Sequence, residues 1–183
     1  ARVAGGAKTG AFAEYAVCPA SSLHAVPDGM ASPLAAAYPA AYTTAYVSLV
    51  SRARLQSGET LLVHGASGGV GTATIDVGRL LGARVIATTA SAQKARMLKS
   101  AGAHEVIVLS PEPGDAFRDQ VKQLTGDRGA DVIFDPVGGD LFDESTRCIA
   151  FNGRLLVIGF AGGRIAALKT NIALTKGFSV IGV

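Results

Sequence analysis

The segment Val63-His64-Gly65-Ala66-Ser67-Gly68-Gly69-Val70-Gly71 constrains the fold more than any other part of the chain. It follows the apolar run Thr60–His64 and leads into a helical stretch, Thr72–Leu81. Glycine lets the backbone approach a pyrophosphate at Gly68 and the helix pack on the strand at Gly71, and a helix N-terminus offers unpaired N–H groups. The segment therefore predicts a dinucleotide-binding turn made of Ala66, Ser67, Gly68, Gly69, Val70 and Gly71.

Two features of this segment limit the interpretation. Ala66 stands where the GxGxxG fingerprint has its first glycine, so the motif is AxGxxG. Gly71 is followed by Thr72 and not by Lys with Ser or Thr, which argues against a P-loop nucleotidase. The structural alternative is a glycine turn that only links a strand to a helix. The strand predicted next, at Arg84–Thr88, favours dinucleotide binding.

Short apolar runs separated by helical stretches recur to the end of the chain. Apolar strands with helical crossovers are typical of a parallel sheet covered on both faces. We therefore predict an α/β fold with a doubly wound, six-stranded parallel Rossmann sheet. Its strands are expected at Thr60–His64, Arg84–Thr88, Val106–Leu109, Asp131–Phe134, Arg154–Ile158 and Phe178–Gly182.

The first third of the chain has a different character. Partial alternation in Gly10–Val17 suggests short antiparallel strands within Arg2–Ala25. An Ala-rich stretch with tyrosines at helical spacing follows, and Pro39 should break or restart a helix there, which predicts a helix over Pro39–Ala53. We expect a β-rich segment over residues 1–42 and a dinucleotide-binding domain over residues 43–183.

The end of the second predicted strand bears on the choice of dinucleotide. NAD sites place an acidic residue about 20 residues after the glycines, and this chain has no carboxylate over residues 87–94. Thr89 and Ser91 can hydrogen-bond a 2′-phosphate, and Lys94 supplies a cation in the first turn of the next helix. This favours NADPH over NADH. In the structural alternative, Ser91 only caps the helix and Lys94 is a solvated surface residue.

The composition and the order of apolar residues argue against a nucleic-acid-binding protein and against a membrane or secreted protein. The net charge of +3 is mild and its cations are scattered, so no nucleic-acid partner is expected. No apolar run is long enough to cross a bilayer and the start lacks a signal-peptide pattern, so we expect no membrane association and a cytoplasmic location.

At this level of detail the chain resembles the medium-chain dehydrogenase/reductase superfamily, and within it the zinc-independent quinone oxidoreductase and zeta-crystallin group. The resemblance covers essentially the whole chain, and it makes the first part a partial GroES-like catalytic-domain segment. It rests on Gly10–Val17, Val26–Gly29, Ala41–Tyr46, Gly58–Ala66, Leu81–Thr88 and Leu174–Val183.

Two places distinguish this chain from the zinc enzymes of the superfamily. Only eight residues separate Val3 from Phe12, which leaves no room for their cysteine-rich lobe. The resemblance would place a zinc cysteine just upstream of Tyr42–Tyr46, where this chain has Pro39-Ala40-Ala41. Because alanine cannot ligate zinc, we expect no metal site.

The resemblance also implies residues around the nicotinamide. Thr44 would position that ring, although a helical Thr can simply bond its own backbone. Tyr42 and Tyr46 are weaker cleft candidates, since tyrosines at this helical spacing more often serve packing. The turns after two strands would complete the site through Val137, Gly138, Gly159, Phe160 and Ala161, with Phe160 alternatively an ordinary core residue. Val108-Leu109-Ser110 lacks the tyrosine that some relatives use at the 2′-phosphate.

The expected function is hydride transfer from NADPH to a quinone or an activated enone without zinc. Two alternatives stay open: an enoyl-thioester (enoyl-CoA) reductase on the same scaffold, and a non-catalytic NADPH-binding or interaction protein. Family members are longer, so we expect a fragment whose proton donor and substrate-orienting residues lie largely outside it. The apolar strand Phe178–Val183 would be exposed at a sheet edge, which with the resemblance predicts a homodimer through it.

Overall fold

A six-stranded parallel sheet organises the protein, whose computed structural model describes residues 1–110 and 117–183. The strand order is β5-β4-β3-β6-β7-β8, which reverses between β3 and β6. This is the doubly wound Rossmann order, and it confirms the predicted fold class. The strands are β3 (Thr60–Val63), β4 (Arg84–Thr89), β5 (Glu105–Val108), β6 (Ala130–Asp135), β7 (Ile149–Val157) and β8 (Ser179–Gly182).

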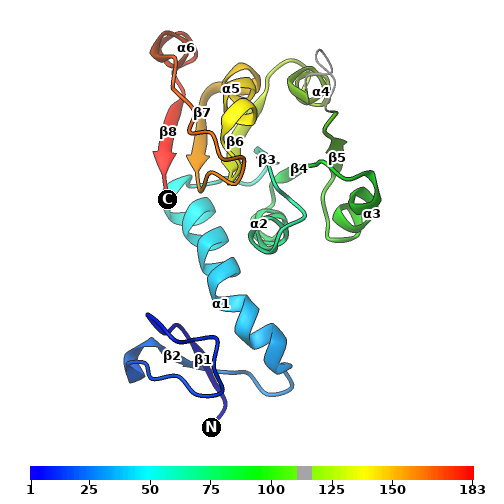
Figure 1. The fold of residues 1–183 in the computed structure, drawn as a ribbon. Coiled ribbons are helices and arrows are strands. Elements are labelled where there is room, and N and C mark those ends of the chain that lie inside the picture. The colour runs from blue at the N-terminus through cyan, green and yellow to red at the C-terminus, as the bar shows by residue number, and fades with distance from the viewer. Residues whose placement is uncertain (111–116) are drawn as a thin grey trace.

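Helices cover both faces of this sheet (Figure 1). One face carries α2 (Gly69–Leu80) and α3 (Ala92–Ser100). The other carries α4 (Phe117–Leu124), α5 (Gly139–Cys148) and α6 (Thr170–Lys176). Such two-sided cover is what right-handed strand–helix–strand crossovers produce.

Side chains of β3 alternate between two apolar cores. Leu61 and Val63 belong to the core under α2, whereas Leu62 belongs to the core under α4 and α5, and all three are fully buried. Burying one such side chain contributes about 1.5–3 kcal/mol relative to leaving it exposed. The central strand is therefore held from both sides, which fixes the position of the turn that follows it.

The N-terminal part contains a small antiparallel pair, β1 (Val3–Gly5) with β2 (Leu23–Ala25), next to a short 3₁₀ turn, Ala20–Ser22. Short antiparallel strands were expected here, but the expectation of a strand within Gly10–Val17 is wrong. Its alternating apolar side chains do not pack against any of the described residues, because they are almost fully exposed: Phe12, Tyr15 and Val17.

Helix α1 (Ser32–Tyr46) leads from the small pair to the large sheet (Figure 1). The predicted start at Pro39 is wrong, because the helix begins at Ser32 and runs through Pro39. Proline cannot donate a hydrogen bond to the carbonyl of Ala35. The rings of Tyr38 and Tyr42, which lie one helical turn apart, nevertheless stack on each other with their centroids 4.2 Å apart. The proposed division at residue 42 falls inside this continuous helix.

A π-helical turn, η2 (Val47–Arg52), follows α1. The Ala53 N–H donates to the Ser48 carbonyl five residues earlier at 2.8 Å, which is the π pattern. The turn directs Arg52 to the far strand, where its Nη2 donates to the Gly182 carbonyl at 2.7 Å.

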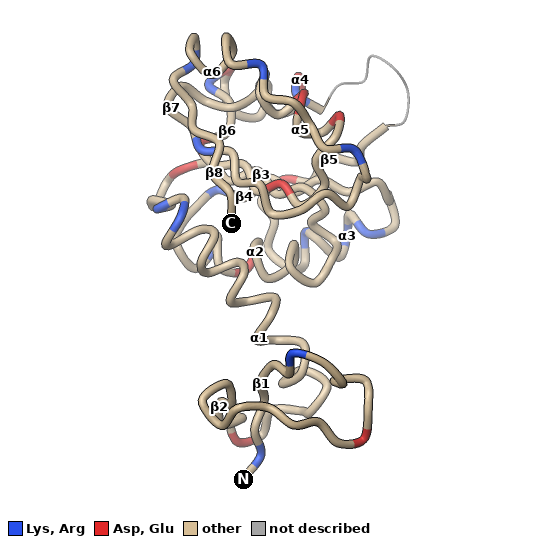
Figure 2. The backbone as a smooth tube through the Cα atoms, turned by 60° about the vertical axis from the view of Figure 1, so that its left-hand side comes forward, with Lys and Arg blue, Asp and Glu red and all other residues tan. Residues whose placement is uncertain are grey.

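Charged residues are dispersed over the structure. Figure 2 shows Lys and Arg on several helices and loops rather than gathered on one face. Among the described residues, no helix combines the length and the apolar character needed to cross a membrane.

Candidate functional site

The glycine-rich turn joins β3 to α2 at the carboxyl edge of the sheet. The Gly68 N–H donates to the Gly65 carbonyl at 3.0 Å, which closes the turn. Within the described part of the chain, the N–H groups of Gly69, Val70 and Gly71 have no hydrogen-bond acceptor. These are the unpaired amides that every helix has in its first turn, and here they lie at the positive end of the α2 dipole.

Two glycines in this turn have opposite surroundings. A Cβ atom on Gly71 would lie 2.5 Å from the Gly65 carbonyl oxygen, whereas a Cβ on Gly69 would meet no atom within 4 Å. Gly71 is therefore required for helix–strand packing, and Gly69 faces open space. Open space beside three free amides fits a pyrophosphate. Ala66 and Ser67 complete the turn, and fully buried Ala66 donates its N–H to the Thr88 carbonyl at 3.3 Å.

The turn after β4 contains the residues predicted to contact a 2′-phosphate. Thr89 is buried, and its Oγ1 accepts the Ser91 N–H at 3.2 Å. Ser91 precedes α3 as its N-cap residue but makes no side-chain capping bond. Lys94 is exposed in the first turn of α3 and has no ion-pair partner among the described residues. The hydroxyl of Ser91 and the ammonium of Lys94 are thus available to an anion.

Two further turns meet beyond β6 and β7. Oδ1 of buried Asp135 accepts the N–H groups of Val137 and Gly138, both at 2.9 Å. The segment after β7 leans on this turn, because the Ala161 N–H donates to the Pro136 carbonyl at 3.1 Å.

The aromatic side chain in that second segment is open to a cavity. Phe160 is 49% exposed, so it is not an ordinary core residue. It lines an apolar cavity of about 220 Å³ together with Gly138, and Gly159 precedes it at the end of the sheet.

Thr44 lines a separate cavity of about 330 Å³ with Val47, Ile158 and Val183. Helix α1 thus brings this hydroxyl next to the ends of β7 and β8. Its Oγ1 also donates to the Ala40 carbonyl at 2.8 Å, the backbone bond expected of a helical Thr.

The two tyrosines do not line that cavity. Tyr42 donates its hydroxyl to Asp76 Oδ2 at 3.0 Å and joins α1 to α2. Burial and the bond to Asp76 raise the pKa of Tyr42. Tyr46 is 55% exposed. The structure therefore gives both a packing or surface position.

His64, at the end of β3, is a polar residue of the site region that the sequence analysis did not single out. It is fully buried, with Nδ1 at 2.9 Å from Thr88 Oγ1 and Nε2 at 2.8 Å from Ser145 Oγ. Burial lowers the pKa of His64 to about 4, against the opposing effect of Asp135. Its signal in the sequence is a histidine that ends an otherwise apolar strand.

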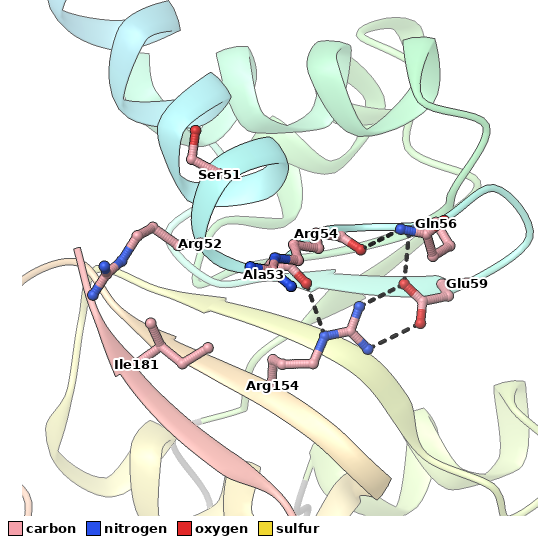
Figure 3. Close-up of a pocket in the computed structure, with 8 residues that line it drawn as sticks. All are labelled: Ser51, Arg52, Ala53, Arg54, Gln56, Glu59, Arg154 and Ile181. Carbon is pink, nitrogen blue, oxygen red and sulfur yellow. Dashed lines mark hydrogen bonds and ion pairs between the residues drawn. The ribbon is translucent and has the colours of Figure 1, made fainter.

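A different cavity, of about 640 Å³, lies next to η2, near the start of β3 and the second half of β7 (Figure 3). Arg154 extends along it and donates Nη2 to Glu59 Oε2 at 2.7 Å and Nε to the Ala53 carbonyl at 3.0 Å. The charges of Arg154 and Glu59 in this cavity are therefore paired with each other. This cavity shares no residue with the four turns, and we do not assign the site to it.

Within residues 1–110 and 117–183, no three His, Cys, Asp or Glu side chains are grouped so that they could hold a metal ion. Pro39, Ala40 and Ala41, the neighbourhood where the resemblance would put a zinc cysteine, lie inside α1.

Comparison with known proteins identifies the family. A family model described as zinc-binding dehydrogenase matches residues 69–183. Mouse (Mus musculus) quinone oxidoreductase-like protein 2 is 40% identical over 183 residues, which is 100% of this chain and 51% of that protein. The chain thus spans about half the length of the curated relative.

Solved structures give the same result. Mycobacterial Rv1454c complexed with NADPH superposes with a TM-score of 0.81 at 35% identity, over 91% of this chain and 50% of that one. An NAD-dependent alcohol dehydrogenase gives 0.87 at 33%, over 94% and 50%. JamJ enoyl reductase gives 0.77 at 31%, over 91% and 48%.

The family match covers the last part of the turn, from Gly69 onward, and every strand from β4 to β8. Together with the mouse relative, it confirms the resemblance to quinone oxidoreductase-like members of the medium-chain dehydrogenase/reductase superfamily. The chain belongs to the zinc-binding dehydrogenase family and, within the medium-chain dehydrogenase/reductase superfamily, to its quinone oxidoreductase-like proteins.

Proposed function

We propose that the protein binds NADPH along the carboxyl edge of the sheet and directs its hydride to a quinone or an activated enone without zinc. The observation that carries this proposal is the turn at Gly68–Gly71, where three unpaired amides at the start of α2 lie next to the open space beside Gly69. Bound NADPH would supply the hydride, and the protein would supply geometry and exclusion of water.

The preference for NADPH is supported by the turn after β4. Thr89, Ser91 and Lys94 bring hydroxyls and a cation to the place where NAD sites have a carboxylate. The NADPH complex of Rv1454c supports the same choice. Because the chain is also similar to an NAD-dependent alcohol dehydrogenase, the affinities for NADPH and NADH need to be compared by titration.

At the nicotinamide end, Thr44 would lie on one side of the ring. The backbone of Val137, Gly138, Gly159 and Ala161 would lie on the other side, with Phe160 at its margin. The proposal excludes zinc because alanines occupy the position upstream of Tyr42–Tyr46 where a zinc cysteine is expected.

Reduction of an enoyl thioester is the second candidate, because JamJ enoyl reductase has the same fold over 91% of this chain. Quinones fit a broad aromatic-lined slot, whereas a CoA thioester needs an additional surface for its phosphates. The two reactions share the cofactor and differ in the acceptor.

The test is steady-state turnover of NADPH by the full protein against a panel of quinones, simple enones and enoyl-CoA thioesters. We expect the highest kcat/KM with a quinone or an enone. A higher value with enoyl-CoA would support the second candidate. Tight NADPH binding without turnover of any acceptor would support a non-catalytic NADPH-binding protein. The absence of binding to either reduced nucleotide would refute the proposal.

A further inference from the structure

His64 joins parts of three cofactor-facing turns. Its side chain contacts Thr88, the residue before Thr89, and its own backbone leads directly into Gly65. The His64 N–H also donates to the Phe134 carbonyl at 3.0 Å, one residue before Asp135. The adenosine-side, pyrophosphate-side and nicotinamide-side turns are thus linked through one buried residue.

The groups around His64 favour one tautomer. Thr88 Oγ1 lies 3.5 Å from the Val63 carbonyl, a long contact to a group that can only accept, and we assign the Thr88 hydroxyl proton to this contact. The lone pairs of Thr88 Oγ1 are then left for a proton on Nδ1. A neutral imidazole has one donor and one acceptor, so Nε2 accepts the hydroxyl proton of Ser145.

We infer that His64 is a positioning residue that, as the neutral Nδ1–H tautomer, fixes the glycine-rich turn against Thr88 and Ser145. The inference rests on the proposed cofactor site and adds the group that pre-organises it.

Burial explains why this role needs a neutral ring. His64, Thr88 and Ser145 are all fully buried, and a charged imidazole would be desolvated there. The resulting low pKa keeps the ring neutral at ordinary pH. A buried network of this kind stiffens the structure only while all its members are satisfied.

The first experiment reads the tautomer without any cofactor. Long-range ¹H–¹⁵N NMR of the full chain should show His64 with a protonated-type Nδ1 and an unprotonated-type Nε2, the signal being assigned by its loss in His64→Gln. The opposite tautomer, or a doubly protonated ring at pH 7, would overturn the inference.

The second experiment removes one partner at a time. Thr88→Val deletes the hydroxyl that accepts from Nδ1, Thr88→Ser restores it, and Ser145→Ala deletes the partner of Nε2. Thr146→Val is the matched control, because Thr146 is buried on the same helix but donates to the Asp143 carbonyl of its own turn.

Amide hydrogen exchange separates positioning from overall stability. The Ala66 N–H donates to the Thr88 carbonyl, so its exchange should speed up in Thr88→Val and Ser145→Ala. It should stay close to wild type in Thr88→Ser and Thr146→Val. If all four variants behave alike, His64 does not position the turn. Ser145→Ala carries the test if Thr88→Val does not fold.

The third measurement is the NADPH dissociation constant of the same variants. Losing one buried hydrogen bond should raise the NADPH dissociation constant roughly fivefold to tenfold in Thr88→Val and Ser145→Ala. Thr146→Val should stay within about twofold. Unchanged affinity in both deletion variants would refute the inference and leave the proposed function standing. A wild-type protein that binds no nucleotide would instead refute the proposed function, with tautomer and exchange still deciding whether His64 positions the turn.

Discussion

The α-carbon of Gly71 lies so close to Gly65 that an added Cβ would stand 2.5 Å from the Gly65 carbonyl oxygen. The start of α2 and the end of β3 therefore meet through backbone atoms alone. Replacing Gly71 by Ala should lower the free energy of unfolding by about 1–3 kcal/mol, because the helix must move away from the strand. Urea denaturation at fixed pH measures this change.

Gly69→Ala is the matched control for that substitution. Its Cβ would meet nothing within 4 Å, so stability should stay within about 0.5 kcal/mol of wild type. The methyl group would nevertheless occupy the space proposed for the pyrophosphate, and NADPH affinity should fall. Equal losses of stability in the two variants would contradict this assignment of the glycines.

Lys94→Ala tests the cofactor preference. We expect about a tenfold weaker affinity for NADPH, because an ammonium–phosphate hydrogen bond is lost, and an unchanged affinity for NADH. Arg96→Ala is the control, since Arg96 is an exposed cation two residues along the same helix and about 200° round its axis. Calorimetric titration of the wild type and both variants with NADPH and NADH measures these affinities. An equal affinity of the wild type for the two cofactors would contradict the preference for NADPH.

The Glu59–Arg154 pair should make stability depend on acid. Burial acts to raise the pKa of Glu59, but the hydrogen bonds from Arg154 and from the Gln56 N–H outweigh it and hold the pKa below its usual value of 4.5. The pair therefore stabilises the fold above that pH, and the contribution is lost as the pH falls through the folded-state pKa.

Glu59→Gln should remove this contribution, about 1.5–3 kcal/mol at pH 7, as expected for a hydrogen-bonded charged pair. The difference from wild type should shrink below pH 4.5. Thermal unfolding of both proteins across that range provides the measurement. If the difference in stability between wild type and Glu59→Gln stays constant with pH, the charge of Glu59 does not contribute to stability.

Assembly can be tested at β8. Among the described residues, this strand pairs only with β7 and lies at the end of the sheet, and Val180 on it is 37% exposed. We propose a homodimer through this edge, so Val180→Lys should shift the protein toward monomer in sedimentation velocity. Leu174→Lys, an exposed position on α6 outside the strand, should not. A wild type that is monomeric at high concentration would count against the proposal.

The sequence predicted most of the sheet because its strands are apolar on both faces. Leu61, Leu62 and Val63 form a continuous apolar run that only a doubly covered strand can bury. The glycine spacing then located the turn at the carboxyl edge. The prediction of a strand within Gly10–Val17 was wrong. Alternation of apolar residues shows only that one face of a strand could be buried, and no described part of the chain covers this segment.

The start of α1 and the role of His64 were not predictable from local rules. Proline removes one helical hydrogen bond, but packing of Tyr42 against α2 offsets that loss, and packing is a tertiary effect. The partners of His64 lie 24 and 81 residues away in the sequence, so no spacing pattern connects them.

The π-helical turn at Val47–Arg52 has a consequence for how the chain can change in length. Each residue of an α-helix advances about 100° round the axis. Deleting one residue here would restore ordinary winding and swing the guanidinium of Arg52 away from Gly182, which lies 130 residues further along the chain. An insertion in a surface loop carries no such penalty. The number of residues between Tyr46 and Ala53 is therefore set by a contact with the last strand of the sheet.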